Sequence, residues 1–263
     1  MYTPVDALSK FLDKVAIVTG ASGGIGRAVA LEFAKEGADL VIQYNANVAA
    51  AKTVADEIGS LGRQALLAQV DFNDFINSPA KTREMVDAAV SRFGKVDLLV
   101  NLAGYPAKGE WNKQFVDLSA QDFLKPIYVD LFGTFLCSRA VAPHFLKQGH
   151  GVIVNVSSTP ALSGHDKGFA FTVAKAGVIG LTKALAVELS PHVRVNTIAL
   201  GNVETEWVKE LRGDEVKAAM NENLIKRFGT AEEIARIILF LCSDDSAFID
   251  GQTLVLDGGG VLR

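Results

Sequence analysis

A glycine-rich segment near the start of the chain restricts the fold more than any other feature of the sequence. Residues 19–26 read Thr-Gly-Ala-Ser-Gly-Gly-Ile-Gly, directly after the apolar run 15–18 and directly before a stretch with apolar residues at helical spacing. This order predicts a strand, a tight turn and the start of a helix. Gly20 can form the turn, Gly24 leaves room for a pyrophosphate, and Gly26 lets the helix pack close to the sheet.

The same segment predicts a site for an anion. The free N–H groups at the N-terminus of a helix carry partial positive charge and point towards a bound phosphate. Glycine-rich turns also join strands to helices where nothing binds, so the segment alone leaves a purely structural role open. It therefore indicates a dinucleotide site that other motifs must support.

The rest of the chain alternates between short apolar runs and helix-patterned stretches. Continuous apolar runs are typical of parallel strands that helices cover on both faces. We therefore predict one α/β domain over residues 1–263, a doubly wound parallel sheet of seven strands with ligands at their carboxyl ends. The expected strands span 14–19, 40–43, 64–70, 96–100, 151–156, 193–198 and 253–256. After a first helix that ends at Gly37, the expected helices span 48–60, 79–93, 120–147, 169–190 and 230–242, with an irregular stretch at 201–228 that includes a substrate lid at about 202–225.

Composition and charge exclude several kinds of partner. Hydrophobic residues make up 49% of the 263 residues, and the formal net charge of −4 provides no basic field for nucleic acid. Cys137 and Cys242 have no Cys or His at ligand spacing, so we expect no metal site, no disulfide and a reducing, cytoplasmic location. Because no apolar run approaches the ~18 residues of a membrane span, we expect no membrane contact. The partner that we expect is a small-molecule substrate.

Further motifs follow the glycine segment in a fixed order. They are Asp71, Asn101-Leu102-Ala103-Gly104, Ser157-Ser158, Lys175, Thr205 and Asp257-Gly258-Gly259. With these motifs the sequence resembles the short-chain dehydrogenase/reductase family along nearly its whole length. The resemblance implies a single Rossmann-type, NAD(P)-binding domain with oxidoreductase activity. It also implies a homo-oligomer, a tetramer or a dimer, built on the long helices 120–147 and 169–190.

The resemblance assigns roles to individual residues of the nucleotide site. It places Asp71 at the adenine, Lys175 at the nicotinamide ribose and Thr205 at the carboxamide. The residues that it implies for cofactor binding are Gly20, Ser22, Gly24, Ile25, Gly26, Tyr44, Asn45, Asp71, Asn101, Ala103, Gly104, Lys175, Val203 and Thr205. Two positions depart from the family pattern: Leu200 precedes Gly201 where Pro is usual, which removes a fixed φ, and Leu102 stands where Asn is usual.

The end of the second strand predicts which nicotinamide cofactor binds. An Asp or Glu there would accept a hydrogen bond from the ribose 2′-hydroxyl and repel a 2′-phosphate. This position falls at Tyr44 and Asn45, so neither a carboxylate nor a basic side chain is present. Ser22, Asn45 and Asn47 can donate to a phosphate, helped by the N-terminus of the helix that starts near Val48. We therefore predict NADP(H).

The usual catalytic residues of the family are only partly present. Members usually have a Tyr four residues before the Lys, a Ser thirteen residues before the Tyr, and an Asn in the long central helix. The corresponding residues are Phe171, Ser158 and Asp130. Phe171 has no proton to give, so a general acid worth ~10²–10⁴ in rate is missing from its usual place. Asp130 is either a partner of Lys175 or an ordinary surface residue. The candidate catalytic residues are Asp166, Lys175, Ser158 and Asp130.

Three functions are compatible with this pattern. The first is a non-catalytic sensor that binds NADP. The second is a carbonyl reductase, of the ketone or 3-oxoacyl type, with another acid such as Asp166, His165 or Lys167, although each is also an ordinary loop residue. The third is hydride transfer to an iminium carbon, which already carries positive charge and becomes a neutral amine without an acid.

The sequence favours the third function. An iminium site needs a carboxylate near the cation and aromatic faces around it, and Asp130 and Asp166 provide the former. The candidate pocket residues are Trp111, Phe169, Phe171 and Trp207, although such residues are often only apolar lining. Phe in place of Tyr, with an Asp in the preceding loop, is similar to the fungal indole-alkaloid branch of the family. That similarity implies an NADP(H)-dependent imine reductase or cyclase, of Diels–Alder or Pictet–Spengler type, for a cationic or aromatic alkaloid substrate.

Overall fold

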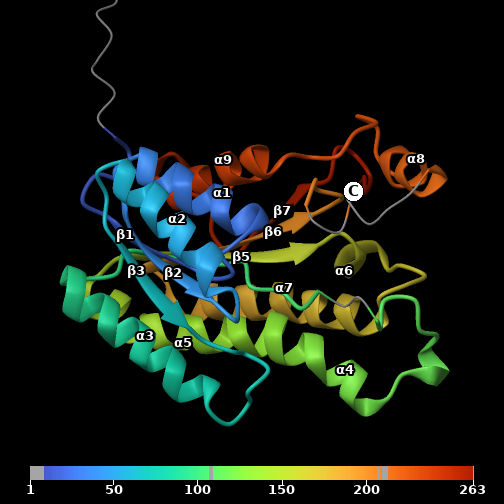
Figure 1. Cartoon of the computed structure of the whole chain (residues 1–263), viewed down its shortest axis with the longest axis horizontal. Coiled ribbons are helices and arrows are strands. Elements are labelled where there is room, and N and C mark those ends of the chain that lie inside the picture. Colours follow the sequence, from blue (N-terminus) through green and yellow to red (C-terminus); the bar gives the residue numbers. More distant parts are fainter. Residues whose placement is uncertain (1–8, 107–108, 206–207, 209–212, 263) are drawn as a thin grey trace, which may run out of the picture.

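Seven parallel strands form a single sheet at the centre of the molecule (Figure 1). The structure is a computed structural model that describes residues 9–106, 109–205, 208 and 213–262. The strand order is β3-β2-β1-β4-β5-β6-β7. The chain therefore adds β2 and β3 on one side of β1 and β4 to β7 on the other side. This arrangement confirms the predicted fold class. The strands are β1 Val15–Val18, β2 Asp39–Tyr44, β3 Ala65–Gln69, β4 Leu98–Asn101, β5 Gly151–Ser158, β6 Val193–Leu200 and β7 Thr253–Leu256.

Helices cover both faces of the sheet (Figure 1). One layer consists of α1, α2 and α9, and the other of α3, α4, α5 and α7. Each face has its own apolar core: Phe33 and Ile238 belong to the first, and Phe145 and Leu136 to the second. All four residues of β1 and of β4 are buried, which explains why the strands appear as unbroken apolar runs in the sequence. The helices are α1 Gly24–Lys35, α2 Val48–Ser60, α3 Ser78–Phe93, α4 Ala120–Pro126, α5 Gly133–Gln148, α6 Pro160–Ser163, α7 Phe169–Leu189, α8 Asp214–Asn221 and α9 Ala231–Cys242.

The helix predicted over 120–147 is not continuous. A π-helical segment, Ile127–Phe132, separates α4 from α5. Pro126 ends α4, and its ring nitrogen has no hydrogen to donate within the helix. The wider turn changes the direction in which the following side chains point, and such segments often occur at functional sites. Asp130 lies inside this segment.

The stretch 201–228 also differs from the prediction, because it contains the helix α8. Two acidic residues, Asp214 and Glu215, occupy the first turn of α8, where their negative charge interacts favourably with the helix dipole and stabilises the helix. Residues 206–207 and 209–212 of the predicted lid lie outside the described residues.

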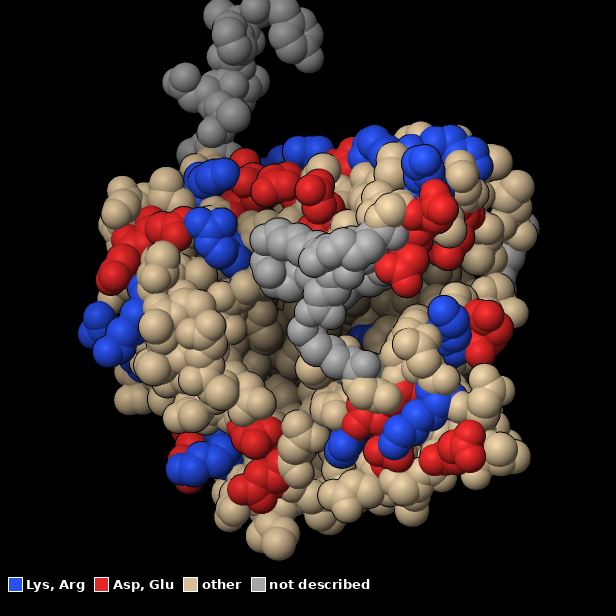
Figure 2. Space-filling view, turned by 45° about the vertical axis from the view of Figure 1, so that its right-hand side comes forward, with Lys and Arg blue, Asp and Glu red and all other residues tan. Residues whose placement is uncertain are grey.

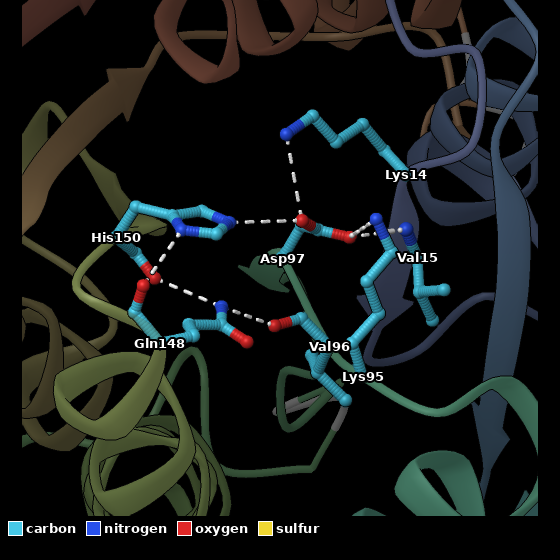
Figure 3. Close-up of polar contacts among 7 residues, drawn as sticks. All are labelled: Lys14, Val15, Lys95, Val96, Asp97, Gln148 and His150. Atoms are coloured by element: carbon cyan, nitrogen blue, oxygen red, sulfur yellow. Dashed lines mark hydrogen bonds and ion pairs between the residues drawn. The ribbon is translucent and has the colours of Figure 1, made fainter.

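A buried carboxylate, Asp97, anchors the start of β4 (Figure 3). Its side chain is 2% exposed and accepts a hydrogen bond from the backbone N–H of Val15 at 2.9 Å. Nζ of Lys14, Nζ of Lys95 and Nε2 of His150 lie 3.2–3.4 Å from its oxygens. Burial alone raises the pKa of Asp97, but these partners outweigh burial and hold the pKa below its ordinary value.

We predict that Asp97→Asn lowers the free energy of unfolding by roughly 2 kcal/mol near neutral pH. Because the folded-state pKa is lowered, the ionised carboxylate stabilises the fold above its ordinary pKa of 3.8, and this contribution is lost as the pH falls through the folded-state value. Urea unfolding at about pH 7 and about pH 3 should therefore show a difference between the two proteins that shrinks in acid. The control is Asp87→Asn, an exposed carboxylate on α3. Equal stability of Asp97→Asn and the unmodified protein at neutral pH would contradict this role.

Candidate active site

Two glycines shape the turn after β1. Gly20 has a φ of +65°, and a Cβ at this position would lie 3.0 Å from Cα of Ala103. A Cβ on Gly26 would lie 2.3 Å from the carbonyl oxygen of Gly20, so α1 packs directly against the turn. The tight turn and the close approach of the helix, both predicted from the sequence, are thus confirmed.

The N-terminus of α1 faces the carboxyl edge of the sheet and fits a phosphate group. No side chain caps it, and its first turn contains no acidic residue. Ser22 and Ile25 are partly exposed on the same turn. A Cβ on Gly24 would lie 3.8 Å from Cγ2 of Thr205, so Thr205 lies across the turn from this helix end. These residues fit the diphosphate of a dinucleotide, because free N–H groups, open backbone and no carboxylate meet there.

Two polar residues that the sequence did not single out hold this turn in place. The side chain of Gln43 accepts a hydrogen bond from the backbone N–H of Gly20 at 2.8 Å and donates to the carbonyl oxygen of Val70 at 2.8 Å. The hydroxyl oxygen of Thr19 accepts hydrogen bonds from the N–H groups of Leu102 and Ala103, both at 2.9 Å. They therefore connect the glycine turn to the ends of β3 and β4. In the sequence, the signal that could have identified these two residues was a polar side chain within or directly after an apolar run.

The residues predicted to contact the adenosine ribose of the cofactor differ in how far their side chains are exposed. Tyr44 is 9% exposed and belongs to the core beside α1 and α2, so its side chain is packed inside rather than offered to a ligand. Asn45 is exposed. Oδ1 of Asn47 accepts a hydrogen bond from the N–H of Ala50 at 3.0 Å and caps α2. Asn45 therefore remains the candidate at this position.

The predicted adenosine residues also divide into two groups. Asp71 is exposed and accepts a hydrogen bond from the N–H of Asn73 at 2.9 Å. Asn101 is 3% exposed, and its Nδ2 donates to Oδ1 of Asn155 at 2.8 Å, so its side chain faces the core. Val203 is 5% exposed and pairs with Gly229 through a β-bridge. Asn101 and Val203 thus support the cleft from below instead of lining it with their side chains.

A buried ion pair joins α7 to the π-helical segment, next to β5. Nζ of Lys175 lies 2.8 Å from Oδ1 of Asp130, and the two side chains are 8% and 0% exposed. Nζ of Lys175 also donates to the carbonyl oxygen of Val156 at 3.0 Å. Oδ2 of Asp130 accepts a hydrogen bond from the N–H of Tyr105 at 3.0 Å. The alternative of a surface Asp130 is therefore excluded, and one carboxylate ties α7 to the loop after β4. It also balances the charge of Lys175.

Ser158 and Phe171 both lie between Asp130 and Lys175 in the chain. The hydroxyl of Ser158 donates to the carbonyl oxygen of Leu200 at 3.1 Å. Nζ of Lys175 lies 5.7 Å from the centre of the Phe171 ring, which therefore covers one side of the ammonium group. The ring provides contact surface at a place where a proton donor was expected.

A second aromatic ring stands beside Phe171. Trp111 meets Phe171 edge to face, with ring centres 5.5 Å apart, and also lies 5.7 Å from the ring of His165. Nδ1 of His165 lies 3.2 Å from Oδ1 of Asp166, whose side chain is 82% exposed. Nδ1 also accepts a hydrogen bond from the backbone N–H of Lys167 at 3.1 Å. The side chain of Asp166 therefore lies at the surface, next to His165.

The other predicted pocket residues are not part of this group. Phe169 packs against Phe115 and Phe123, with ring centres 4.9 and 6.4 Å away, in a separate cluster. Trp207 lies outside the described residues.

Neither cysteine is positioned for chemistry. Burial raises the pKa of Cys242 to about 12 and raises that of Cys137 further. Among the residues that the structure describes, no group of three or more His, Cys, Asp and Glu side chains is arranged to hold a metal ion.

Comparison with protein families and curated proteins agrees with this geometry. The family model described as Enoyl-(Acyl carrier protein) reductase matches residues 20–260. The chain is 36% identical over 251 residues to (2S)-[(R)-hydroxy(phenyl)methyl]succinyl-CoA dehydrogenase subunit BbsD of Thauera aromatica, with 95% of this chain and 97% of that protein covered. It is also 36% identical over 253 residues to the 3-oxoacyl-[acyl-carrier-protein] reductase of Thermotoga maritima, with 95% and 98% covered.

Solved structures with the same fold include two bacterial proteins. A short-chain type dehydrogenase/reductase from Mycobacterium marinum superposes with a TM-score of 0.87 at 32% identity, covering 97% of this chain and 98% of that chain. A short chain dehydrogenase from Burkholderia cenocepacia, in complex with NADP, superposes with a TM-score of 0.86 at 32% identity, covering 95% and 99%. Both likenesses extend over the whole sheet and its helices.

We predict that Asp130→Asn destabilises the protein by roughly 3 kcal/mol, because it leaves the buried ammonium of Lys175 without its counter-charge. The amide keeps an acceptor for the N–H of Tyr105, so the loss stays at the low end of that expected for a broken buried pair. Urea unfolding at neutral pH measures the difference, and Asp87→Asn on α3 is the matched control. If Asp130→Asn unfolded at the same urea concentration as the unmodified protein, the pair would not be holding α7 to the loop after β4.

Proposed function

The chain belongs to the short-chain dehydrogenase/reductase family of oxidoreductases, and from that premise we propose that it is an NADP(H)-dependent reductase of a ketone or 3-oxoacyl carbonyl group. The observation that carries the proposal is the ion pair of Lys175 and Asp130, which a hydrogen bond from Lys175 to Val156 holds against β5, the strand that ends at Ser158. The names of two relatives support it, since one is a 3-oxoacyl reductase and the other acts on an alcohol that carries a phenyl group.

The choice of NADP(H) rests on the end of β2. Asn45 is exposed there, and neither it nor Tyr44 is a carboxylate that would repel a 2′-phosphate. The N-terminus of α2 begins at Val48 directly beyond it. The NADP complex of the Burkholderia protein supports the same choice. Lys175 and Thr205 would hold the nicotinamide end.

The reduction needs a proton as well as a hydride. When bound, NADPH supplies the hydride, which forms the new C–H bond as the carbonyl π electrons move to oxygen. We assign the proton to the ring of His165, because His165 and Phe171 contact the same indole ring of Trp111. Nδ1 of His165 accepts a hydrogen bond from the backbone N–H of Lys167 at 3.1 Å, which leaves the ring proton on Nε2. Nε2 is therefore the atom that gives the proton to the carbonyl oxygen. Asp166, with Oδ1 at 3.2 Å from Nδ1, lies beside the ring as a positioning residue.

Iminium reduction is the second candidate. It is favoured by one observation, that the ring of Phe171 lies where an acid is expected while Asp130 cancels the charge of Lys175. A cationic carbon needs no acid and is not repelled by a neutral ion pair. The finer hypotheses of alkaloid metabolism and of cyclisation remain predictions.

We further propose that copies of the chain associate through α5 and α7. Several apolar side chains on these helices are exposed, among them Val187 at 84%, Leu146 at 45% and Val173 at 38%. α7 even has the length and the mean hydropathy, 1.5, of a membrane span, although no such run was expected from the sequence. Because α7 packs against β5 and β6, a second copy is the simpler cover for its exposed face.

We predict that NADPH binds at least about tenfold more tightly than NADH, equivalent to about 1.4 kcal/mol. Asn45→Asp should reverse this preference, because a carboxylate repels the 2′-phosphate and accepts a hydrogen bond from the 2′-hydroxyl. Fluorescence titration of both cofactors measures the two affinities. Tighter binding of NADH by the unmodified protein would refute the assignment of this position.

We predict that the unmodified protein oxidises NADPH with ketones or 3-oxoacyl thioesters. His165→Asn should lower that rate by ~10²-fold or more, because it removes the proton donor. The same variant should leave any reduction of cyclic iminium compounds unchanged. The matched control, His192→Asn, changes an exposed histidine after the end of α7.

The outcomes separate the three functions. Turnover of iminium compounds alone would favour the second candidate. Tight binding of NADPH without turnover of either class would indicate a sensor. A His165→Asn variant as active on ketones as the His192→Asn control would refute the assigned acid.

A further inference from the structure

The indole ring of Trp111 controls what can lie beside Phe171. The two rings meet edge to face with centres 5.5 Å apart. The same indole lies 5.7 Å from the ring of His165. Trp111 is therefore next to both Phe171 and the assigned proton donor, so a substrate that reaches both residues lies beside its indole.

The loop before α7 fixes the position of this ring. Gly168 has a φ of +65°, and a Cβ there would lie 2.3 Å from Cζ3 of Trp111. The N–H of Gly168 donates to the carbonyl oxygen of Trp111 at 2.8 Å. The indole thus occupies a notch that only a glycine leaves open. Because the ring is already held in place, the protein loses little side-chain entropy when a ligand stacks on it.

The surroundings of the two rings carry little net charge. The ammonium of Lys175 is balanced by Asp130 at 2.8 Å. In Figure 2, uncharged residues form much of the wall of the hollow on this face, and most Lys, Arg, Asp and Glu side chains lie further out. Asp166 belongs to the exposed rim, at 82% exposure. Lys175 therefore offers no unbalanced positive charge to a carboxylate or phosphate at the reacting carbon.

We propose that Trp111 and Phe171 bind an aromatic ring attached to the reacting carbon, so that the substrate class is a neutral aryl ketone. The inference rests on the proposed carbonyl reduction and names its substrate. Aromatic rings pack on one another edge to face or offset, and such pairs gain more than their buried area alone provides. Because Phe171 has no hydroxyl, the apolar surface of the two rings continues as far as the ammonium group of Lys175.

The test compares two ketones of equal size, phenyl methyl ketone and cyclohexyl methyl ketone. The unmodified protein should prefer the phenyl compound by about tenfold in kcat/KM, as expected for one aromatic contact. Trp111→Leu should remove the preference, because KM should rise more for the phenyl compound than for the cyclohexyl compound. Gly168→Ala, which keeps the indole but displaces it, should have the same effect. Phe115→Leu is the matched control, because Phe115 lies before α4 and packs on Phe169.

The thermal midpoint and the affinity for NADPH verify that each variant is folded. Equal losses for both ketones in Trp111→Leu, or a preference of the unmodified protein for the cyclohexyl ring, would overturn the inference while leaving the proposed function in place.

A second measurement does not depend on turnover. Benzamide is a neutral aromatic probe, and it should quench the tryptophan fluorescence of the NADPH-free protein at lower concentration than cyclohexanecarboxamide. This difference should disappear in Trp111→Phe. If no ketone is reduced but the difference is present, the proposed function fails and the aromatic site stands. Equal quenching by both amides would refute the site itself.

Discussion

All seven strands run in one direction, and this constraint places the chemistry. Each connection after a strand begins at the same edge of the sheet, so the glycine turn after β1, the loop after β4 and the loop after β5 meet there. The reversal of strand order between β1 and β4 opens the crevice into which α1 directs its N-terminus. At the opposite edge, Asp97 joins the starts of β1, β4 and β5 through Val15, His150 and Val152.

The ion pair between Lys175 and Asp130 gives this site its individual character. The family usually places an Asn where this chain has Asp130, and a Tyr where it has Phe171. Both changes act on the same lysine, because one balances its charge and the other covers it with a ring. We propose that the resulting site, with a balanced lysine and more aromatic surface, suits neutral or cationic substrates and takes its proton from another residue.

The sequence predicted the parts of the molecule that local chemistry determines. Glycine spacing predicted the turn at Gly20 and the close approach at Gly26, because within residues 19–26 a Cβ at these two glycines would meet the backbone. Buried strands and the fold class followed from unbroken apolar runs. The roles given to Lys175 and Ser158 came from the resemblance, and both lie near the carboxyl edge of the sheet.

What the sequence could not predict depends on side-chain direction and tertiary contacts. The π-helical segment has the same apolar pattern as an α-helix, so the burial of Asp130 was left open. Tyr44 and Asn101 were assigned to the cofactor. Each is the last residue of its strand, and there its side chain points into the core. Thr19 and Gln43 support the cleft through backbone partners distant in sequence, for which no local motif exists.

The central claim is that this cleft transfers hydride to carbon although residue 171 carries no acid. The most direct measurement is a single turnover with NADPH that carries deuterium at C4 of the nicotinamide, in excess protein, with the product alcohol analysed by mass spectrometry. The account predicts that deuterium from one face of the nicotinamide appears on the former carbonyl carbon. Saturating binding of the labelled cofactor with no deuterium transferred to any ketone or 3-oxoacyl thioester would contradict it.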